Sequence, residues 1–146
     1  MSESTARKAS WNDTVIEQFR AGEQRIVDTF DRSFLLLLHT VGARTGARRT
    51  SPLAYLTLDD QLVIVGSAGG RDTHPSWYFN LLAHPEVTFE RWRDDAIEEV
   101  EAIAVPAEGE EYHRLWAQIA ERAPGFDAYR SKTRRQIPVV ILKSRT

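Results

Sequence analysis

Three arginines lie within six positions of a segment that also contains two glycines, GARTGARR at residues 42–49. Arg44, Arg48 and Arg49 carry guanidinium groups, which bind phosphate and carboxylate oxygens in pairs. Glycine-containing turns let backbone N–H groups point at the same anion. The alternative is a solvated hairpin tip, where basic residues discourage pairing between strand edges. The segment therefore predicts either a local anion site or a charged turn.

A second segment of small residues follows the β-branched stretch QLVIV. It contains Ser67, Ala68, Gly69 and Gly70. Small side chains there would allow a flat ring to approach the backbone, whose N–H groups would reach the polar edge of the ring. A plain structural turn is the alternative explanation for paired glycines.

Aromatic residues are concentrated in the segment PSWYFNL at residues 75–81. Burial in the core is the usual role of residues such as Trp77, and only Asn80 needs a polar partner there. Tyr129 lies much later, close to Arg130 and Lys132. Its hydroxyl group therefore faces either a pocket or water.

Several familiar kinds of chemistry have no support in this sequence. There is no cysteine, which excludes thiolate catalysis, disulfides and cysteine-based metal sites. The histidines, His39, His74, His84 and His113, are too scattered for a metal-binding pair, so we expect no metal site. Nucleophile-elbow, phosphate-loop and dinucleotide fingerprints are absent. The net charge is 19 − 21 = −2, which gives no overall attraction to nucleic acid.

The segments around these residues have the patterns of short strands and a few helices. Asn12 and Asp13 precede apolar residues at near-helical spacing up to Phe30, which predicts one or two helices. A short helix is expected after Pro75, an amphipathic helix over residues 110–122, and a helical turn carrying Phe126 and Tyr129. Strands are predicted over residues 34–40, 50–58, 61–67, 87–92, 97–105 and 137–143.

These elements predict an α+β domain with a mostly antiparallel sheet of six strands, which could close as a small barrel. Residues 1–11 are expected to form a flexible N-terminal segment, and residues 12–146 a single domain. The longest apolar run, residues 34–38, is far too short to span a membrane. We expect a cytoplasmic protein; whether the first helix contacts a membrane surface, and whether the chain is a monomer or homodimer, stay open.

Three segments, taken in order, resemble one known family. Residues 36–53 (LLLHTVGARTGARRTSPL) are similar to its signature LLLTTTGRKSGKPRTTPL. Residues 69–70 (GG), 74–81 (HPSWYFNL) and 83–87 (AHPEV) resemble its block GG…HPAWYHNLKANPEV. Residues 129–134 (YRSKTR) and 137–140 (IPVV) resemble its closing YQxxTxR…IPVVVL. The family is that of the deazaflavin-dependent nitroreductases, within the split β-barrel flavin and deazaflavin oxidoreductases.

The resemblance implies a split β-barrel that binds coenzyme F420, a deazaflavin carrying a phosphate and an oligoglutamate tail. The arginine segment would contact the phosphate and tail, and the small residues and aromatic segment would surround the ring. The implied cofactor-binding residues are Arg44, Thr45, Arg48, Arg49, Thr50, Pro52, Ser67, Ala68, Gly69, Gly70, Arg71, Trp77 and Asn80. Tyr129 would face the substrate as the implied catalytic residue.

The implied reaction is hydride transfer from reduced F420 to a small electrophile such as a quinone, an enone or a nitro compound. Such a protein needs neither a nucleophile nor a metal, because the cofactor carries the chemistry. Ala43 and Ala47 stand where the family is commonly basic, which leaves fewer charges for the tail. Two alternatives remain at this stage: a related barrel that binds FMN or haem, and a non-catalytic binder of a lipid or small hydrophobic molecule.

Overall fold

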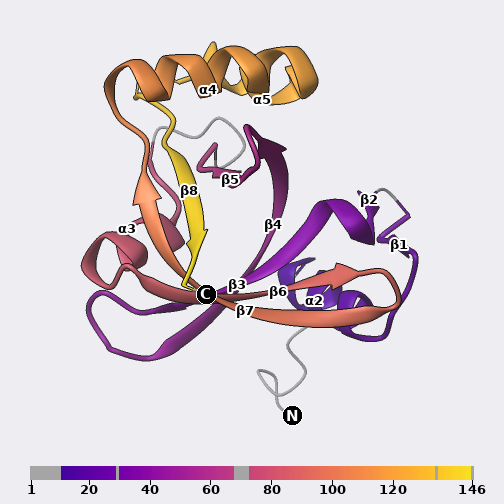
Figure 1. The fold of residues 1–146 in the computed structure, drawn as a ribbon. Coiled ribbons are helices and arrows are strands. Elements are labelled where there is room, and N and C mark those ends of the chain that lie inside the picture. The colour runs from indigo at the N-terminus through magenta and orange to yellow at the C-terminus, as the bar shows by residue number, and fades with distance from the viewer. Residues whose placement is uncertain (1–10, 29, 68–72, 134, 146) are drawn as a thin grey trace.

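Six strands form a closed barrel in the computed structural model, which describes residues 11–28, 30–67, 73–133 and 135–145 (Figure 1). The strands are β3 (Leu35–Val41), β4 (Arg48–Leu58), β5 (Gln61–Val65), β6 (Glu86–Arg93), β7 (Ala96–Pro106) and β8 (Val139–Ser144). They pair in the order β3-β4-β5-β8-β7-β6, and pairing of β3 with β6 closes the barrel. Every neighbouring pair is antiparallel. The predicted α+β fold with a six-stranded antiparallel barrel is confirmed.

Four helices are packed around the barrel in the described part of the chain. They are α2 (Trp11–Arg20), α3 (Ser76–Ala83), α4 (Gly109–Arg122) and α5 (Pro124–Arg130). In Figure 1, α4 and α5 lie across the top, α2 at the lower right and α3 at the left. The two groups α2 and α4–α5 therefore cover different outer parts of the barrel.

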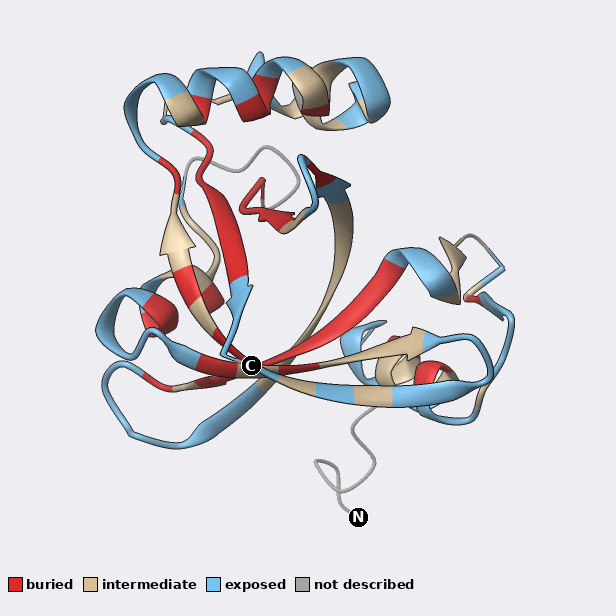
Figure 2. Ribbon diagram, in the orientation of Figure 1, coloured by how far each residue is buried: buried red, intermediate tan, exposed pale blue. Residues whose placement is uncertain are grey.

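Strands β3, β5 and β8 are apolar on both faces because both of their faces are covered. In β3, Leu36 and Leu38 point into the barrel, where α3 contributes Trp77. The alternate residues Leu35 and Leu37 point outward and pack under α2. The same alternation holds in β5 and β8, whose outward residues pack under α4. Figure 2 shows the result as nearly continuous burial along β3 and β8. Such double burial explains the unbroken apolar runs of these strands.

Helix α4 buries the apolar face that its sequence predicts. Tyr112, Leu115, Trp116 and Ile119 are all buried against the outer faces of β5 and β8. The Tyr112 hydroxyl donates a 2.6 Å hydrogen bond to the carbonyl of Ile137 just before β8. Each apolar side chain buried in this way contributes about 1.5–3 kcal/mol. The helix is therefore firmly attached to the barrel.

The N-terminal helix is shorter than its apolar spacing predicts. It includes Trp11, a residue of the segment expected to be flexible, and ends at Arg20 instead of extending toward Phe30. Residues 1–10 of that segment lie outside the described residues. Gly22 has a φ of +82°, a left-handed conformation that ends the helix. The two-residue strands β1 (Arg25–Ile26) and β2 (Phe30–Asp31) follow. The later apolar residues still pack on the outer face under α2, but from a hairpin.

Other element boundaries differ from the predicted ones where a residue cannot continue the hydrogen-bond ladder between strands. Phe34 belongs to a 3₁₀ turn, η1 (Arg32–Phe34), and not to β3. The fifth strand ends at Val65, before Gly66. A Cβ at Gly66 would lie 2.8 Å from Cγ of Pro138, so only glycine allows this close approach. β8 begins after that proline, which has no N–H to donate.

None of the helices in the described ranges is both long enough and apolar enough to cross a membrane.

Candidate active site

A large cavity lies on the outside of the barrel, between the two groups of helices. Its volume is about 960 Å³. Ser51 to Ala54 of β4 form one wall, and the chain before and into α3 forms another. Trp11 and Asn12 of α2 lie on one side of the opening, and Phe126 and Tyr129 of α5 on the other. Elements from both ends of the sequence are therefore required to build it.

Four of the predicted site residues line this cavity together. They are Pro52, Ser67, Trp77 and Tyr129. Ser67 and Trp77 are buried, and Pro52 and Tyr129 are partly buried. The walls are thus mostly apolar or aromatic with a few hydroxyl groups, the usual composition of a site for a flat organic ring. The predicted residues Ala68, Gly69, Gly70 and Arg71 lie outside the described residues.

The arginine segment forms the turn between β3 and β4. The N–H of Gly42 donates to the carbonyl of Ala47 at 2.7 Å, and the N–H of Ala47 donates to Oγ1 of Thr45 at 3.1 Å. A Cβ on Gly42 would lie 2.7 Å from that hydroxyl, so the turn needs glycine there. Gly46 has a φ of +72°. Thr45 is consequently a turn-stabilising residue in this structure.

The three arginines of this turn are exposed and have no ion pair among the residues that the structure describes. Arg49 precedes the cavity residue Pro52 by three positions on β4, a separation of about 10 Å along a strand. Arg48 lines a separate groove of about 290 Å³, which also contains Glu86 and Glu101. The uncompensated charges on the turn favour binding of an anion close to the cavity.

Asn80 is buried beneath this turn and connects it to α3. Its Nδ2 donates to Oγ1 of Thr40 at 3.2 Å, and its Oδ1 accepts a 3.0 Å hydrogen bond from the N–H of Ala43. Both the carbonyl oxygen and the NH₂ group of the side chain thus form hydrogen bonds within the protein. Asn80 holds the arginine turn against α3, and its direct contact with a cofactor stays a prediction.

Thr50 belongs to a polar network under α2. Its Oγ1 lies 2.9 Å from Nδ1 of His39, whose Nε2 lies 2.5 Å from Oε2 of Glu90. Arg20 of α2 donates to the same carboxylate oxygen at 2.8 Å. Burial raises the pKa of Glu90, but the hydrogen bonds with Arg20 and His39 outweigh it and hold that pKa below its usual value. The Thr50 hydroxyl is therefore engaged inside the protein.

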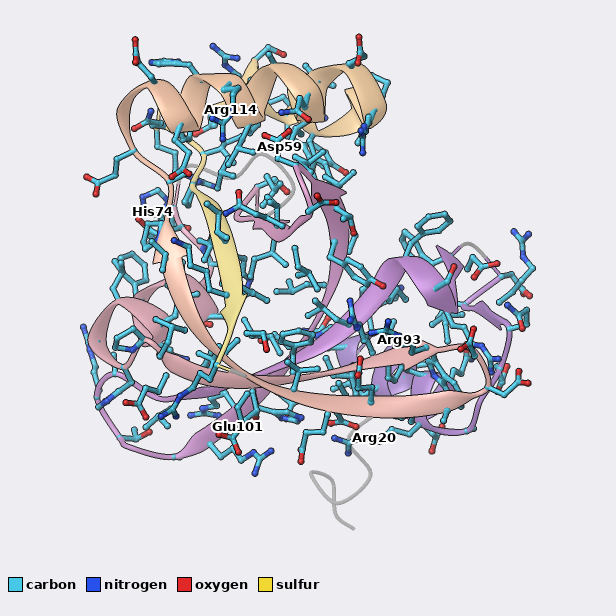
Figure 3. All side chains as sticks on the ribbon, viewed as in Figure 1. Arg20, Asp59, His74, Arg93, Glu101 and Arg114 are labelled. Carbon is cyan, nitrogen blue, oxygen red and sulfur yellow. The ribbon has the colours of Figure 1, made fainter. Side chains whose placement is uncertain are left out.

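Arg135, which the sequence analysis did not single out, joins two parts of the cavity wall. Its Nη2 donates to the carbonyl of Ser67 at 2.8 Å, and its Nη1 lies 2.9 Å from Nδ1 of His74. His74 is labelled in Figure 3, in the region between α3 and α4. A signal for Arg135 was available, because the arginine of the closing motif YQxxTxR falls two positions after Thr133.

Other wall residues could not have been found from local sequence. Trp11, Asn12, Phe30 and Phe126 line the cavity but belong to no motif of the resemblance. They come together only because the fold brings α2, β2 and α5 to the cavity wall formed by β4. No group of three metal-ligating side chains is found in the described part of the chain.

The arrangement fits the two chemical parts of coenzyme F420. The cavity between Pro52 and Trp77 offers an apolar space of a size suited to a flat ring system. The adjoining turn offers guanidinium groups, without ion pairs in the described residues, to a phosphate and to tail carboxylates. The residues present thus match a ligand with an apolar ring at one end and anions at the other.

Comparisons with known proteins agree with this match. Residues 11–144 match the family model described as F420H(2)-dependent quinone reductase. An F420H(2)-dependent quinone reductase of Mycobacterium tuberculosis is 40% identical over 115 residues, which cover 75% of this chain and 73% of that protein.

Two solved structures are also similar. One is described as an F420-H2 dependent reductase, with 35% identity, a TM-score of 0.63 and coverage of 75% of this chain and 94% of that one. The other is described as a domain-swapped dimer, with 35% identity, a TM-score of 0.65 and coverage of 90% and 98%. The resemblance drawn from the three sequence segments is confirmed. The chain belongs to the F420H(2)-dependent quinone reductase family, and it is an oxidoreductase whose cofactor is coenzyme F420.

Proposed function

We propose that this protein reduces quinones with reduced coenzyme F420 bound between the arginine turn and the large cavity. The proposal rests on the position of the arginine turn beside the cavity. The turn leads into β4, which forms part of the cavity wall. Its arginines are exposed and have no ion pair in the described residues. The relative from M. tuberculosis is named as a quinone reductase, which supports this substrate class.

Reduced F420 supplies the hydride, and the residues of the chain bind, orient and shield the reactants. Arg44 and Arg49 hold the phosphate and tail carboxylates by charge-assisted hydrogen bonds. Pro52, Ser67 and Trp77 position the ring against the barrel. Trp11, Phe30 and Phe126 reduce the access of water at the opening.

Tyr129 is the residue we assign to the substrate. It lies on α5 at the cavity, next to Phe126, with ring centres 6.4 Å apart. The ammonium group of Lys132 lies 5.6 Å from the Tyr129 ring. The hydroxyl donates a hydrogen bond, or a proton, to the oxygen on which charge develops. Enones and nitro compounds carry an oxygen of the same kind, so we extend the proposed substrate range to them.

We also propose a homodimer, a state supported by the similar structure described as a domain-swapped dimer. Cytoplasmic localisation and contact of the N-terminal helix with a membrane surface stay predictions. Trp11 of that helix is 58% exposed.

A fluorescence titration of the purified protein with F420 and with FMN tests the cofactor half of the proposal. We expect saturable binding of F420 and much weaker binding of FMN. An anaerobic assay with reduced F420 and a short-chain quinone then tests the reaction. Tight F420 binding without quinone reduction would overturn the substrate class but not the cofactor site.

The substitution Tyr129→Phe tests the role of the hydroxyl, because it keeps the packing of the ring. We expect an unchanged dissociation constant for F420 and a fall in kcat of about threefold to tenfold with quinone. Steady-state kinetics with a quinone, an enone and a nitro compound make the measurement. Wild-type turnover on all three would remove Tyr129 from the proposed reaction.

A further inference from the structure

Arg135 connects the chain after β5 with the chain before α3. One guanidinium nitrogen donates to the Ser67 carbonyl at 2.8 Å and another lies 2.9 Å from Nδ1 of His74. Its own N–H donates to Oγ1 of Thr133 at 3.3 Å, which helps to hold the arginine in place. Ser67 and His74 both line the large cavity. The contact therefore acts directly on the geometry of the cavity wall.

This contact determines which nitrogen of His74 carries a proton. A guanidinium group only donates hydrogen bonds, so Nδ1 of His74 must accept and carries no hydrogen. The ring proton of the neutral imidazole then resides on Nε2. No hydrogen-bond partner of Nε2 is found among the residues that the structure describes. Within the described ranges, the imidazole thus has one N–H donor to which no partner is assigned.

The surroundings of His74 also favour its neutral form. Burial, and then the positive charge of Arg135, lower the pKa of His74 below its usual value. Tyr78 of α3 packs edge-on against the ring, with centres 4.9 Å apart. His74 also lines a second cavity of about 420 Å³, whose other titratable residues are Tyr78, Glu108 and Tyr112.

We propose that Nε2–H of His74 donates a hydrogen bond to a carbonyl oxygen of a flat conjugated ring in the large cavity, and that Arg135 is the positioning residue that maintains this donor. The inference rests on the proposed function, since both the deazaflavin and a quinone carry such an oxygen. It extends the site to two residues outside the cofactor-binding set that the resemblance implies.

The donor form can be measured without cofactor or substrate. In ¹⁵N-histidine-labelled full-length protein, NMR distinguishes a protonated ring nitrogen from an unprotonated one. We expect His74 to carry its proton on Nε2 at pH 7 and to take up a second proton below the usual pH range of an imidazole. In Arg135→Met the midpoint of this titration should move to higher pH, because a cation and a donor to Nδ1 are lost. A proton on Nδ1 of wild-type His74 would overturn the proposal.

Binding and kinetics then show which ring the donor contacts. His74→Phe removes the donor, His74→Gln keeps a side-chain N–H, and His84→Gln is the matched control because exposed His84 lies outside both cavities. If the donor contacts the cofactor, His74→Phe should weaken F420 binding about threefold to tenfold with an unchanged KM for quinone. If it contacts the quinone, the KM or kcat for quinone should change by a similar factor with F420 affinity unchanged.

His74→Gln should retain more of the affected parameter than His74→Phe does, and Arg135→Lys more than Arg135→Met. Folded His74→Phe protein that equals His84→Gln in F420 affinity and in quinone kinetics would overturn the proposal. If His74→Phe does not fold, His74→Gln and the wild-type NMR measurement decide the matter. A wild-type protein that binds F420 but reduces no quinone contradicts the proposed substrate and leaves the cofactor arm of this test intact.

Discussion

Two clusters of charged side chains lie near the same end of the β3–β4 pair and differ in their partners. On the β3–β4 turn, Arg44, Arg48 and Arg49 are exposed and have no ion pair in the described part of the chain. Under α2, Arg20 is paired with Glu90 at 2.8 Å, and that carboxylate also contacts His39. Paired charges hold elements together, whereas unpaired charges on a rigid turn are available to a ligand.

The contacts that hold each cluster in place explain why one is paired and the other is not. The arginine turn is held by its own backbone hydrogen bonds and by Asn80, so its guanidinium groups are not needed for its shape. The Arg20–Glu90–His39 network instead uses side chains to join α2 to the paired strands β6 and β3. We therefore expect substitutions on the turn to weaken cofactor binding, and substitutions in the network to lower stability.

The largest expected effect is the loss of F420 affinity in Arg49→Ala. Removal of a charged fork from phosphate or carboxylate oxygens should weaken binding about tenfold to a hundredfold, as measured by fluorescence titration. Turnover at saturating cofactor should nearly recover, because a contact remote from the reacting atoms mostly contributes uniform binding. Arg93→Ala is the control, since Arg93 is also exposed but lies on the β6–β7 hairpin (Figure 3). There Nη1 of Arg93 lies 3.7 Å from Oε1 of Glu98. Equal F420 affinities for the two variants would contradict the comparison.

The next largest effect is expected on the stability of Glu90→Gln. This change leaves Arg20 and buried His39 without their carboxylate, which should lower the free energy of unfolding by about 1–3 kcal/mol. F420 affinity should stay within twofold of wild type. The control is Glu98→Gln, measured by urea unfolding. The ion pairs of Glu98 with Arg91 and Arg93 are more exposed, so they contribute less than about 1 kcal/mol to the free energy of unfolding. A stability loss no greater than that of Glu98→Gln would show that the network is not structural.

The pH dependence of stability should separate the paired cluster from the turn. The pKa of Glu90 is lowered in the folded protein, so its contribution is fully present above its unfolded pKa of about 4.3. That contribution is lost as the pH falls through the folded pKa. Burial also lowers the pKa of His74, so its contribution begins to fall earlier, below about pH 6.5. Urea midpoints from pH 7 to pH 3 should decrease in these two stages, and Glu90→Gln should lack the more acidic one.

Salt should produce the smallest of these effects and should act on the turn alone. Exposed charges are screened over about 8 Å at physiological ionic strength, whereas partly buried pairs are screened much less. The dissociation constant of F420 should therefore rise severalfold between low and high NaCl, with little change in the urea midpoint. A dissociation constant that does not depend on salt would remove the arginine turn from the proposed binding site.

Local patterns in the sequence predicted most of the elements. The alternation and double burial of the barrel strands, the apolar face of α4 and the glycine turn at Gly42 and Gly46 follow from periodicity and from backbone chemistry over a few residues. The motif resemblance added the family and the cofactor, and it placed Pro52, Ser67, Trp77 and Tyr129 among the site residues that the structure brings to one cavity.

Tertiary structure decided the features that depend on partners distant in the sequence. The helix that was expected to extend toward Phe30 ends at Arg20, because Gly22 and the β1–β2 hairpin offer the same apolar residues a better packing on the barrel. Thr50 and Asn80 use their polar groups within the protein, with partners on β3 and in the turn after it.

The sequence by itself determined the strands, the charged turn and, through three motifs, the family, because each depends on residues that lie within a few positions of one another. Only the folded chain placed α2 and α5 on either side of the cavity and set Arg135 between Ser67 and His74. A hydrogen bond between residues 61 positions apart depends on where the barrel brings their backbones, and no local propensity contains that information.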